Sequence, residues 1–210
     1  QAYQKRARYV LDWLIALGRA QHKKIPVRLV KGAYWDTEIK QAQMAGHEGY
    51  PVFTRKATTD LNYMACAQTM LQATDVIYAQ FATHNAYTIA SVLSLAESVS
   101  ADRSAFEFQN LQGMGKSLHK QLLDQKIHCR IYAPVGSHEE LLPYLVRRLL
   151  ENGANSSFVN QLIKRDVDIE SLVQNPMDIL SHYADVANPQ IPLPQDIFQP
   201  LRLNSLGADV

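Results

Sequence analysis

The sequence predicts an α/β protein whose core is a parallel β-sheet. Four short apolar segments alternate with helical segments, the pattern of parallel strands joined by crossover helices. The predicted strands are VRLVKGAY (27–34), VIYAQFAT (76–83), AFEFQNL (105–111) and CRIYAPV (129–135). A (β/α)8 barrel needs eight strands and typically about 250 residues. These four units therefore form either a smaller open sheet or part of something larger.

The first predicted element is an amphipathic helix before the first strand. Its apolar positions recur at three- and four-residue spacing, as on the buried face of a helix. They are Val10, Leu11, Leu14, Ile15 and Leu17. Glycine is common just past a helix C-terminus, so this helix is expected to end near Gly18.

A helical pattern follows each predicted strand. The expected helices span residues 38–45 and about 58–71, then 87–97, 116–125 and 138–152. Ser137, with Glu140 three residues later, forms a capping box that marks the start of the last helix. Short helical patterns follow Gly153, and the prolines of IPLPQDIF (191–198) then predict an extended linker.

In each predicted strand, one set of alternating residues is apolar and the other is polar. The apolar set comprises Val27 and Leu29; Ile77, Ala79 and Phe81; Phe106 and Phe108; Ile131 and Ala133. The polar set comprises Arg28; Gln80 and then His84; Glu107 and Gln109; Arg130 and Tyr132. A sheet covered by helices on both faces should be apolar in both sets. The polar set thus indicates a face that looks into a site, with an internal hydrogen-bond network as the alternative for any single residue.

The segment YLVRRLLENGA (144–154) carries a polar stripe along the last predicted helix. Tyr144, Arg147, Arg148 and Glu151 fall at i, i+3, i+4 and i+7, on one helical face. The apolar side, on which the helix is expected to pack, consists of Leu142, Leu145, Val146, Leu149 and Leu150. The stripe is either a solvated surface with an Arg147–Glu151 pair or two guanidinium groups that hold a ligand carboxylate.

Composition excludes several classes of protein. The 210 residues have a net charge of +1, with 21 Lys and Arg spread along the chain against 20 Asp and Glu, so nucleic acid is not an expected partner. No apolar run approaches the roughly 18 residues that a membrane-spanning helix needs. Cys66 and Cys129 lack paired spacing, so neither a disulfide framework nor a zinc site is expected, and a reducing compartment fits.

The sequence does not match two common nucleotide-binding motifs. LQGMGKS (111–117) lies between a strand and a helix, but a P-loop requires glycine where this chain has Asn110. Gly113 and Gly115 are more simply explained by a tight turn. No G-x-G-x-x-G follows the first strand, which leaves a Rossmann fold without support.

The seven histidines lack the spacing of metal ligands, and no metal site is expected. His84 is the histidine retained as a candidate site residue. It follows a strand directly, and parallel barrels build their active sites at the carboxyl ends of their strands. A surface or capping role is the alternative.

Six segments together resemble the flavin-dependent proline dehydrogenase domain of the bifunctional proline utilization A enzymes of bacteria. They are VRLVKGAYWD (27–36), YPVFTRK (50–56), QFATHN (80–85), FEFQNLQGMG (106–115), RIYAPVG (130–136) and YLVRRLLENGANSSFV (144–159). The resemblance covers nearly the whole chain. In addition, RLNSLGADV (202–210) resembles the entry to the aldehyde dehydrogenase half of those enzymes.

The resemblance implies that residues 1–187 are the C-terminal part of a (β/α)8 barrel, holding strands 5 to 8, the eighth helix and C-terminal helices. Residues 188–210 would be a proline-rich linker toward an aldehyde dehydrogenase domain. The implied activity is the oxidation of L-proline to Δ1-pyrroline-5-carboxylate with non-covalent FAD, by hydride transfer from proline C5 to flavin N5. A membrane quinone would accept the electrons. A homo-oligomer in the cytoplasm is expected, with peripheral contact at the inner membrane left open.

The resemblance also assigns residues to the substrate. They are Tyr34, Leu111, Tyr132, Tyr144, Arg147 and Arg148. Arg147 and Arg148 would clamp the proline carboxylate, which makes the polar stripe a binding surface. Tyr132 and Tyr144 would form walls around the proline ring.

A further set of residues is assigned to the cofactor by the same resemblance. It comprises Arg28, Lys31, Gly32, Ala33, Trp35, Thr54, Arg55, Lys56, Thr83, His84, Asn85, Gln109, Arg148 and Glu151. Arg28 would lie close to flavin N5, where a cation favours the anionic reduced form. The catalytic set would therefore be Arg28, Tyr132, Arg147 and Arg148.

Two other functions stay open at this stage. The chain could be a half-barrel module for assembly or dimerisation, or part of another barrel enzyme whose phosphorylated substrate binds the turn at Gly113 to Gly115. The family also uses a lysine and an aspartate from earlier strands, which would precede Gln1. Half a barrel exposes two sheet edges and an apolar surface.

We therefore predict that the isolated 210-residue chain binds FAD weakly and turns over little proline, or self-associates to cover those edges. Purification, an absorbance scan at the flavin bands and size-exclusion chromatography measure this. A monomer that carries stoichiometric flavin and reduces a dye with proline would contradict the prediction.

Overall fold

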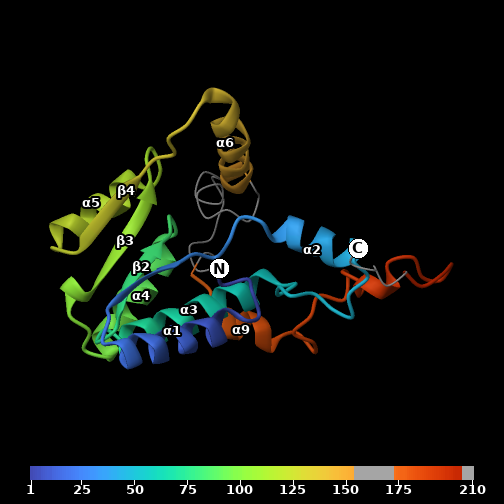
Figure 1. Cartoon of the computed structure of the whole chain (residues 1–210), viewed down its shortest axis with the longest axis horizontal. Helices are drawn as coiled ribbons and strands as arrows, with labels where there is room; N and C mark the ends of the chain where they lie inside the picture. The colour runs from blue at the N-terminus through green and yellow to red at the C-terminus, as the bar shows by residue number, and fades with distance from the viewer. Residues whose placement is uncertain (154–172, 205–210) are drawn as a thin grey trace.

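The computed structural model describes residues 1–153 and 173–204, and contains a four-stranded parallel sheet (Figure 1). The strands are β1 (Ile25–Leu29), β2 (Ile77–Ala82), β3 (Phe106–Leu111) and β4 (His128–Tyr132). They lie side by side in chain order, each parallel to its neighbour. The predicted α/β architecture is confirmed.

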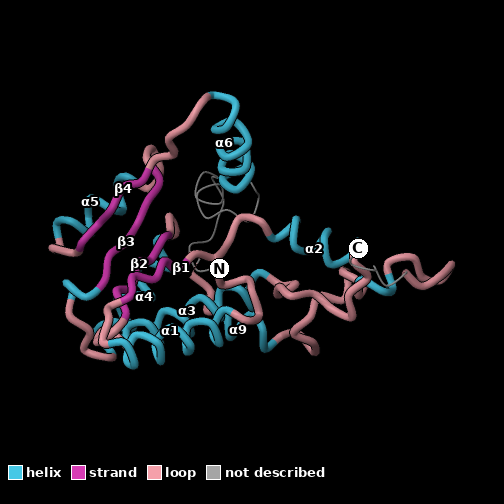
Figure 2. The backbone as a smooth tube through the Cα atoms, viewed as in Figure 1, coloured by secondary structure: helices cyan, strands magenta, loops and turns pink. Residues whose placement is uncertain are grey.

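Helices alternate with the strands as predicted. They are α1 (Ala7–Gln21), α2 (Trp35–Met44), α3 (Lys56–Gln72), α4 (Ala86–Ser98), α5 (Lys116–Asp124), α6 (His138–Gly153) and α9 (Pro176–Ser181), with short 3-10 helices η1 (Arg103–Ala105) and η2 (Pro194–Asp196). Figure 2 shows α6 standing apart from α1, α3, α4 and α5, beyond the carboxyl end of β4.

The core lies between the apolar face of the sheet and helices α1, α3 and α4. Phe81, Phe106 and Phe108 are at most 1% exposed, and their ring centroids lie 5.8 to 6.0 Å apart. Tyr63 and Met70 of α3 are fully buried in the same cluster. Large aromatic side chains contribute most of the apolar area that such a core removes from water.

The polar side chains of the strands share the opposite face of the sheet, as predicted. The register places Arg28 of β1 beside Gln80 of β2, which in turn lies beside Glu107 of β3. In the central strand β3 both faces are buried, so Glu107 and Gln109 are only 3% and 5% exposed. These two polar side chains therefore need hydrogen-bond partners within the protein.

The first helix runs past its predicted end. It continues three residues beyond Gly18 to Gln21, and His22 takes the left-handed conformation, with φ of 49°. Gly18 serves packing instead, because a Cβ atom there would lie 3.0 Å from Val76 Cβ and 3.1 Å from the carbonyl oxygen of Lys23. The glycine thus marks a close contact between α1 and the segment before β2.

The first strand is shorter than predicted, ending at Leu29 rather than at Tyr34. Beyond it, the carbonyl groups of Val30 and Lys31 accept hydrogen bonds from Ala2 and Tyr3 of the N-terminal segment. The fourth strand ends at Tyr132 because β3, its only neighbour among the described residues, ends at Leu111. Pairing with a neighbour, and not the apolar pattern, decides where each strand stops.

The C-terminal segment packs against the α2–α3 region. Tyr50 donates a hydrogen bond to the carbonyl of Pro192 at 2.8 Å, and Asn204 donates one to the carbonyl of Gln43 at 2.7 Å. The extended conformation predicted for residues 191–198 is wrong at Pro194–Asp196, which form η2. The domain boundary expected at residue 187 stays a prediction.

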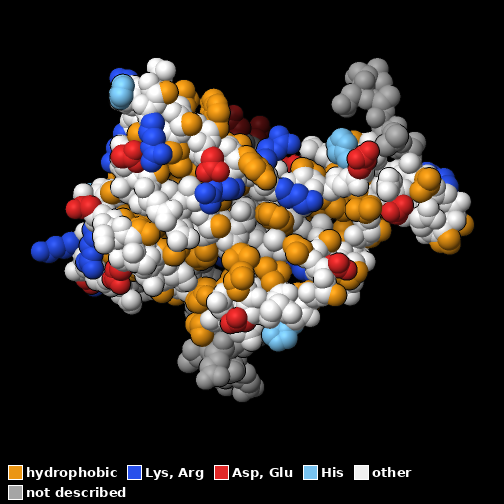
Figure 3. Space-filling model, turned by 90° about the horizontal axis from the view of Figure 1, so that it is seen from below, with side chains coloured by type: hydrophobic (Ala, Val, Ile, Leu, Met, Phe, Trp, Pro, Cys, Tyr) orange, Lys and Arg blue, Asp and Glu red, His pale blue; other side chains and the backbone are white. Residues whose placement is uncertain are grey.

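The sheet has two open edges in the described residues, at β1 and β4. Large apolar side chains are exposed on β4 and on α1, including Ile131 at 66% and Trp13 at 61% exposure. Figure 3, a view from the side on which α1 lies, shows hydrophobic surface between the charged groups. Among the described helices, none combines the length and hydropathy needed to span a bilayer.

Replacing Gly18 with alanine is predicted to lower the free energy of unfolding by about 1 kcal/mol. Overpacking against Val76 Cβ and a backbone carbonyl costs about 1–3 kcal/mol, and the gain in helix propensity offsets about 1. Urea titration measures the difference. Gly49→Ala is the control because no atom lies within 4 Å of its added Cβ; a stabilised Gly18→Ala variant would contradict the packing role.

Candidate active site

Most of the predicted site residues lie at the carboxyl ends of the strands or in the loops that follow. Arg28 lies one residue before the end of β1, His84 follows β2, and Tyr132 ends β4. Gln109 and Leu111 belong to the last half of β3. Because parallel strands end at a common edge, the topology brings together residues that are far apart in sequence.

Arg28 forms the centre of this cluster. Its Nε donates a hydrogen bond to Gln109 Oε1 at 2.8 Å, and its Cζ lies 4.9 Å from the centroid of the Tyr132 ring. Three predicted residues from β1, β3 and β4 are therefore in direct contact. Burial raises the pKa of Tyr132, against the opposing influence of the Arg28 charge, so the phenol stays protonated.

His84 is a neutral hydrogen-bond acceptor. The backbone N–H of Leu111 donates to His84 Nε2 at 3.1 Å. Burial, with the charges of His119, Arg148 and Arg28, lowers the pKa of His84 to about 4. The ring also lies against Gly115, where φ is +62° and an added Cβ would approach His84 Cδ2 to 3.3 Å. The glycine turn after β3 is thus shaped around His84.

The arginines of α6 lie near other predicted residues of the site. Arg147 Cζ lies 4.6 Å from the ring centroid of Tyr34, and Arg148 Cζ lies at the same distance from that of Tyr144. The charge of Arg148 influences both His84 and Tyr132. These contacts bring the predicted substrate residues of α6, β4 and the N-terminus of α2 into one region.

The packing predicted for the apolar side of α6 is wrong. Leu142, Leu145 and Val146 are 51%, 42% and 43% exposed, although they were expected to face the core. The side chains of Leu149 and Leu150, like that of Glu151, lie outside the described residues. At the described positions the apolar side of the helix is no more buried than the arginines of the stripe, of which Arg147 is exposed and Arg148 partly buried.

Two predicted cofactor residues, Lys31 and Lys56, share the carboxylate of Asp60. The Lys31 Nζ lies 2.5 Å from Asp60 Oδ1, and the Lys56 Nζ lies 2.6 Å from Asp60 Oδ2. Burial lowers the pKa of Lys31, with the Asp60 charge acting in the opposite direction. One carboxylate between two ammonium groups leaves a net positive charge beside the loop after β1.

The loop between β1 and α2 carries the other predicted contacts of this region. Gly32 has φ of +120°, and the Tyr3 ring occupies the space that a side chain there would need. Trp35 begins α2, and its indole N–H donates to the carbonyl of Phe53 at 2.7 Å. Ala33, which lies between Gly32 and Trp35 in the sequence, is partly buried.

Thr54 and Arg55 turn toward the C-terminal segment instead of the Arg28 cluster. Thr54 Oγ1 accepts a hydrogen bond from the backbone N–H of Asn188 at 2.9 Å. Arg55 donates to the carbonyl of Ala187 at 3.1 Å, and its Cζ lies 3.8 Å from the ring centroid of Tyr183. Their assignment to the cofactor stays a prediction.

Thr83 and Asn85 shape the turn that presents His84. Thr83 Oγ1 accepts from the Asn85 N–H at 3.1 Å, and Asn85 Oδ1 caps α4 by accepting from Thr88 N–H at 3.1 Å. A side-chain oxygen at the N-cap satisfies one of the free N–H groups of the first turn. Their local roles are therefore structural, and a cofactor contact would be additional.

Asp60, Glu107 and Arg130 were not among the predicted substrate-binding, cofactor-binding or catalytic residues. Asp60 could have been found from its i, i+4 spacing to Lys56. Glu107 and Arg130 were recognised as part of the polar face, and they form an ion pair at 2.7 Å. Their link to the Arg28 cluster required the register of the sheet.

Comparison with known proteins identifies the family. The model of the family described as proline dehydrogenase matches residues 1–161. The chain belongs to this family. Its resemblance to proline dehydrogenases, expected from the sequence, is thereby confirmed.

Three relatives show how far the similarity extends. The bifunctional protein PutA of Klebsiella aerogenes is 49% identical over 222 residues, which cover 100% of this chain and 17% of that protein. A mutant form of Bradyrhizobium japonicum proline utilization A, in its crystal structure, is 58% identical with a TM-score of 0.91, covering 99% of this chain and 21% of that one. The proline dehydrogenase of Deinococcus radiodurans is 34% identical over 135 residues, covering 64% of this chain and 39% of the relative.

The chain spans about a fifth of the length of the bifunctional relatives that it matches. The structural match confirms the predicted (β/α)8 barrel type for its α/β fold. The numbering of the described strands as 5 to 8 stays a prediction.

The depressed pKa of His84 predicts a pH-dependent stability. The unfolded chain binds a proton near pH 6.5 and the folded chain only near pH 4, so the free energy of unfolding should fall as the pH drops from about 6.5 to about 4. Denaturant titrations at pH 7 and pH 5 measure this. The His84→Gln variant should lose part of this pH dependence, and the variant of the exposed His47, His47→Gln, should retain it. The prediction would be contradicted if the free energy of unfolding changed equally between pH 7 and pH 5 in the unmodified chain and in both variants.

Proposed function

We propose that this chain supplies the substrate-clamping and flavin-contacting part of an enzyme that oxidises L-proline to Δ1-pyrroline-5-carboxylate. Membership of the proline dehydrogenase family supports the substrate and the reaction. The observation that carries the proposal is the position of the two α6 arginines: Arg147 lies over the Tyr34 ring, and the Arg148 charge acts on His84 and Tyr132 after β2 and at the end of β4.

The orientation of α6 leaves three apolar side chains exposed in this chain. Turning Leu142, Leu145 and Val146 outward forgoes burial worth roughly 1.5–3 kcal/mol for a fully buried side chain of this kind. A guanidinium that lies over an aromatic ring presents its planar fork at the ring edge, and such a fork matches the two oxygens of a carboxylate.

The remaining substrate residues fit a small, largely apolar ring. Tyr132 at the end of β4 and Tyr144 of α6 are both partly buried, and the charges of Arg28 and Arg148 both act on Tyr132. Leu111 is 5% exposed at the end of β3, and Tyr34 lies beneath Arg147. Two aromatic walls and two cations at one end suit an amino acid whose carboxylate is its only strong anion.

Proline dehydrogenases are flavoproteins as a class, and the described residues also fit a flavin dinucleotide. Arg28 and Gln109 offer a cation and an amide to a polar ring edge, and Lys31 with Lys56 offer excess positive charge to phosphates. Bound FAD would supply the two-electron acceptor for hydride from proline C5. The direct neighbour of Arg28 is a neutral amide, so its positive charge stays available to stabilise the reduced ring.

The contribution of the protein to the rate would be mainly placement. Arg147 and Arg148 would hold the carboxylate, and Tyr132 and Tyr144 would orient the ring toward the sheet edge. Holding reacting atoms near contact distance can contribute several kcal/mol to the lowering of a barrier. These side chains need only exclude water from the site and keep their own charges.

The partners of the reaction extend this proposal to the longer protein. A membrane quinone would accept the electrons, which calls for a cytoplasmic enzyme with peripheral membrane contact. Oligomerisation would cover exposed apolar surface such as Trp13.

The open edges at β1 and β4 also favour an assembly role as a second candidate function. The phosphate-binding alternative is weakened because His84 lies against Gly115 and the Asn110 amide donates to the carbonyl of Met114, so side chains of the chain occupy part of the turn after β3.

Changing Arg147 or Arg148 to methionine in the full-length enzyme is predicted to raise KM for proline by about two orders of magnitude, equivalent to about 2.7 kcal/mol of lost binding. Methionine keeps much of the side-chain volume but cannot bind a carboxylate. Steady-state kinetics with a dye acceptor measures the change. Arg8→Met on the exposed face of α1 is the matched control. A KM within twofold of the unmodified enzyme would show that the stripe is only a surface.

A further inference from the structure

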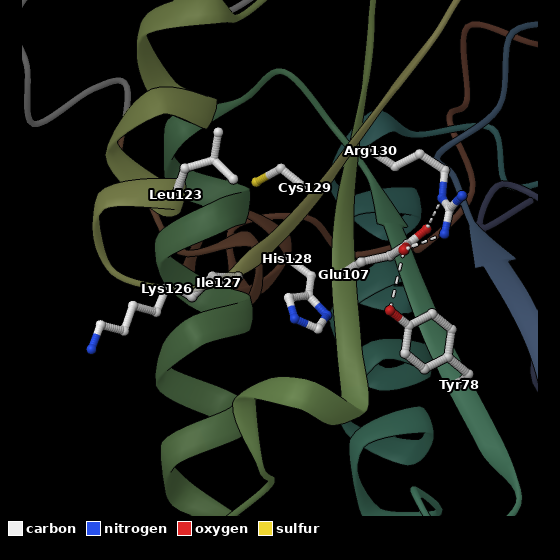
Figure 4. Close-up of a pocket in the computed structure, with 8 residues that line it drawn as sticks. All are labelled: Tyr78, Glu107, Leu123, Lys126, Ile127, His128, Cys129 and Arg130. Carbon is white, nitrogen blue, oxygen red and sulfur yellow. Dashed lines mark hydrogen bonds and ion pairs between the residues drawn. The ribbon is translucent and has the colours of Figure 1, made fainter.

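Glu107 is a buried carboxylate that accepts four hydrogen bonds. Its Oε1 accepts from Gln109 Nε2 and from Arg130 Nε, each at 2.7 Å. Its Oε2 accepts from Arg130 Nη2 at 2.9 Å and from the Tyr78 hydroxyl at 3.1 Å. Figure 4 shows Glu107 pointing toward Arg130 and Tyr78 on the polar face of the sheet. A side chain only 3% exposed with four donors is held in one position.

This arrangement determines which end of the Gln109 amide faces Arg28. An ionised carboxylate can only accept, so the amide NH2 of Gln109 must point toward Glu107. The amide oxygen must then point the other way, where it accepts from Arg28 Nε at 2.8 Å. The opposite orientation would place NH2 against the Arg28 guanidinium and oxygen against the Glu107 carboxylate, and the buried carboxylate would lose one of its donors.

The sheet geometry makes the connection possible. Glu107 and Gln109 are two residues apart on β3 and therefore point to the same face. Arg28 lies on β1 and reaches Gln109 across β2, where the residue paired with Gln109 is Ala82. A methyl group at that position leaves space for the long arginine side chain.

Charge alone does not explain the effect of Glu107 on Arg28. Glu107 is neutralised locally by the two-point contact with Arg130. Burial raises the pKa of Glu107, but the hydrogen bonds from Arg130, Gln109 and Tyr78 lower it by more, so the pKa lies below its usual value. The carboxylate is therefore ionised and can only accept hydrogen bonds. The influence on Arg28 passes through the orientation of one amide.

We propose that Glu107 is a positioning residue that, through the Gln109 amide, holds the Arg28 guanidinium at the carboxyl edge of the sheet. The inference rests on the proposed function, because that function gives Arg28 its role beside the flavin. Glu107 would touch neither substrate nor cofactor. Its loss should therefore matter only while Gln109 and Arg28 are present.

The test uses the full-length enzyme and the variants Glu107→Met, Gln109→Met and Arg28→Met, alone and in pairs. Glu107→Met removes the acceptor at similar volume, and should lower kcat/KM roughly 10- to 100-fold through misplacement of Arg28. It should also make the midpoint potential of the bound flavin more negative, because a displaced cation stabilises the reduced ring less. Adding Glu107→Met to Arg28→Met or to Gln109→Met should change neither quantity further.

Two variants separate positioning from simple stabilisation. Glu107→Gln keeps an oxygen that can accept from Gln109, while Arg130, which is 61% exposed, can turn to water; it should retain activity and potential close to those of the unmodified enzyme. Glu97→Met, exposed on α4, is the matched control. Should Glu107→Met not fold, Gln109→Met alone must still shift the potential in the direction of Arg28→Met.

The outcomes are distinct. Additive losses in the Glu107→Met and Arg28→Met pair, or an unchanged potential in Gln109→Met while Arg28→Met shifts it, overturn the positioning role and leave the proposed function intact. An Arg28→Met enzyme with unchanged potential and kcat/KM overturns the assignment of Arg28 itself, and the positioning role with it.

Discussion

The alternation of side chains along four parallel strands is the constraint on which this structure depends. It places Phe81, Phe106 and Phe108 under the helices and turns Arg28 and Glu107 to the opposite face. A shift of one residue in register would exchange the two sets, putting an ion pair into the core and aromatic rings into the site. Core packing therefore also fixes the direction of the polar side chains, and the site needs no separate scaffold.

Helix α6 is governed by a different balance. Its capping box forms as expected, with Glu140 accepting from the Ser137 N–H at 2.9 Å and Ser137 Oγ accepting from the Glu140 N–H at 3.3 Å. Local sequence thus determines where the helix begins. Beyond its start, Arg147 of the helix contacts the Tyr34 ring at the N-terminus of α2, while Leu142, Leu145 and Val146 are exposed. The helical pattern alone could not predict this tertiary contact of the polar stripe.

Much of the fold was predictable because strand and helix periods are local. All four strands were found, and the helices from α1 to α6 were recognised with errors at their ends. The errors have physical causes: Gly18 is small for contact with Val76 and does not end its helix, and β1 stops where the N-terminal segment takes over the carbonyl of Val30. For the site, the polar face and His84 followed from the residues themselves, whereas the roles of Lys31, Trp35 and the arginines of α6 came from family resemblance.

By itself, the sequence determined the α/β class, the polar face of the sheet, the position of His84 after a strand and the capping of α6. Only the tertiary structure decided that Arg28 binds Gln109, 81 residues away, that Thr54 binds Asn188, 134 residues away, and that Lys31 shares Asp60 with Lys56. Periodicity reports which way a side chain points from its own element. It carries no information on which distant donor will occupy that space, because strand register and loop packing set the partner.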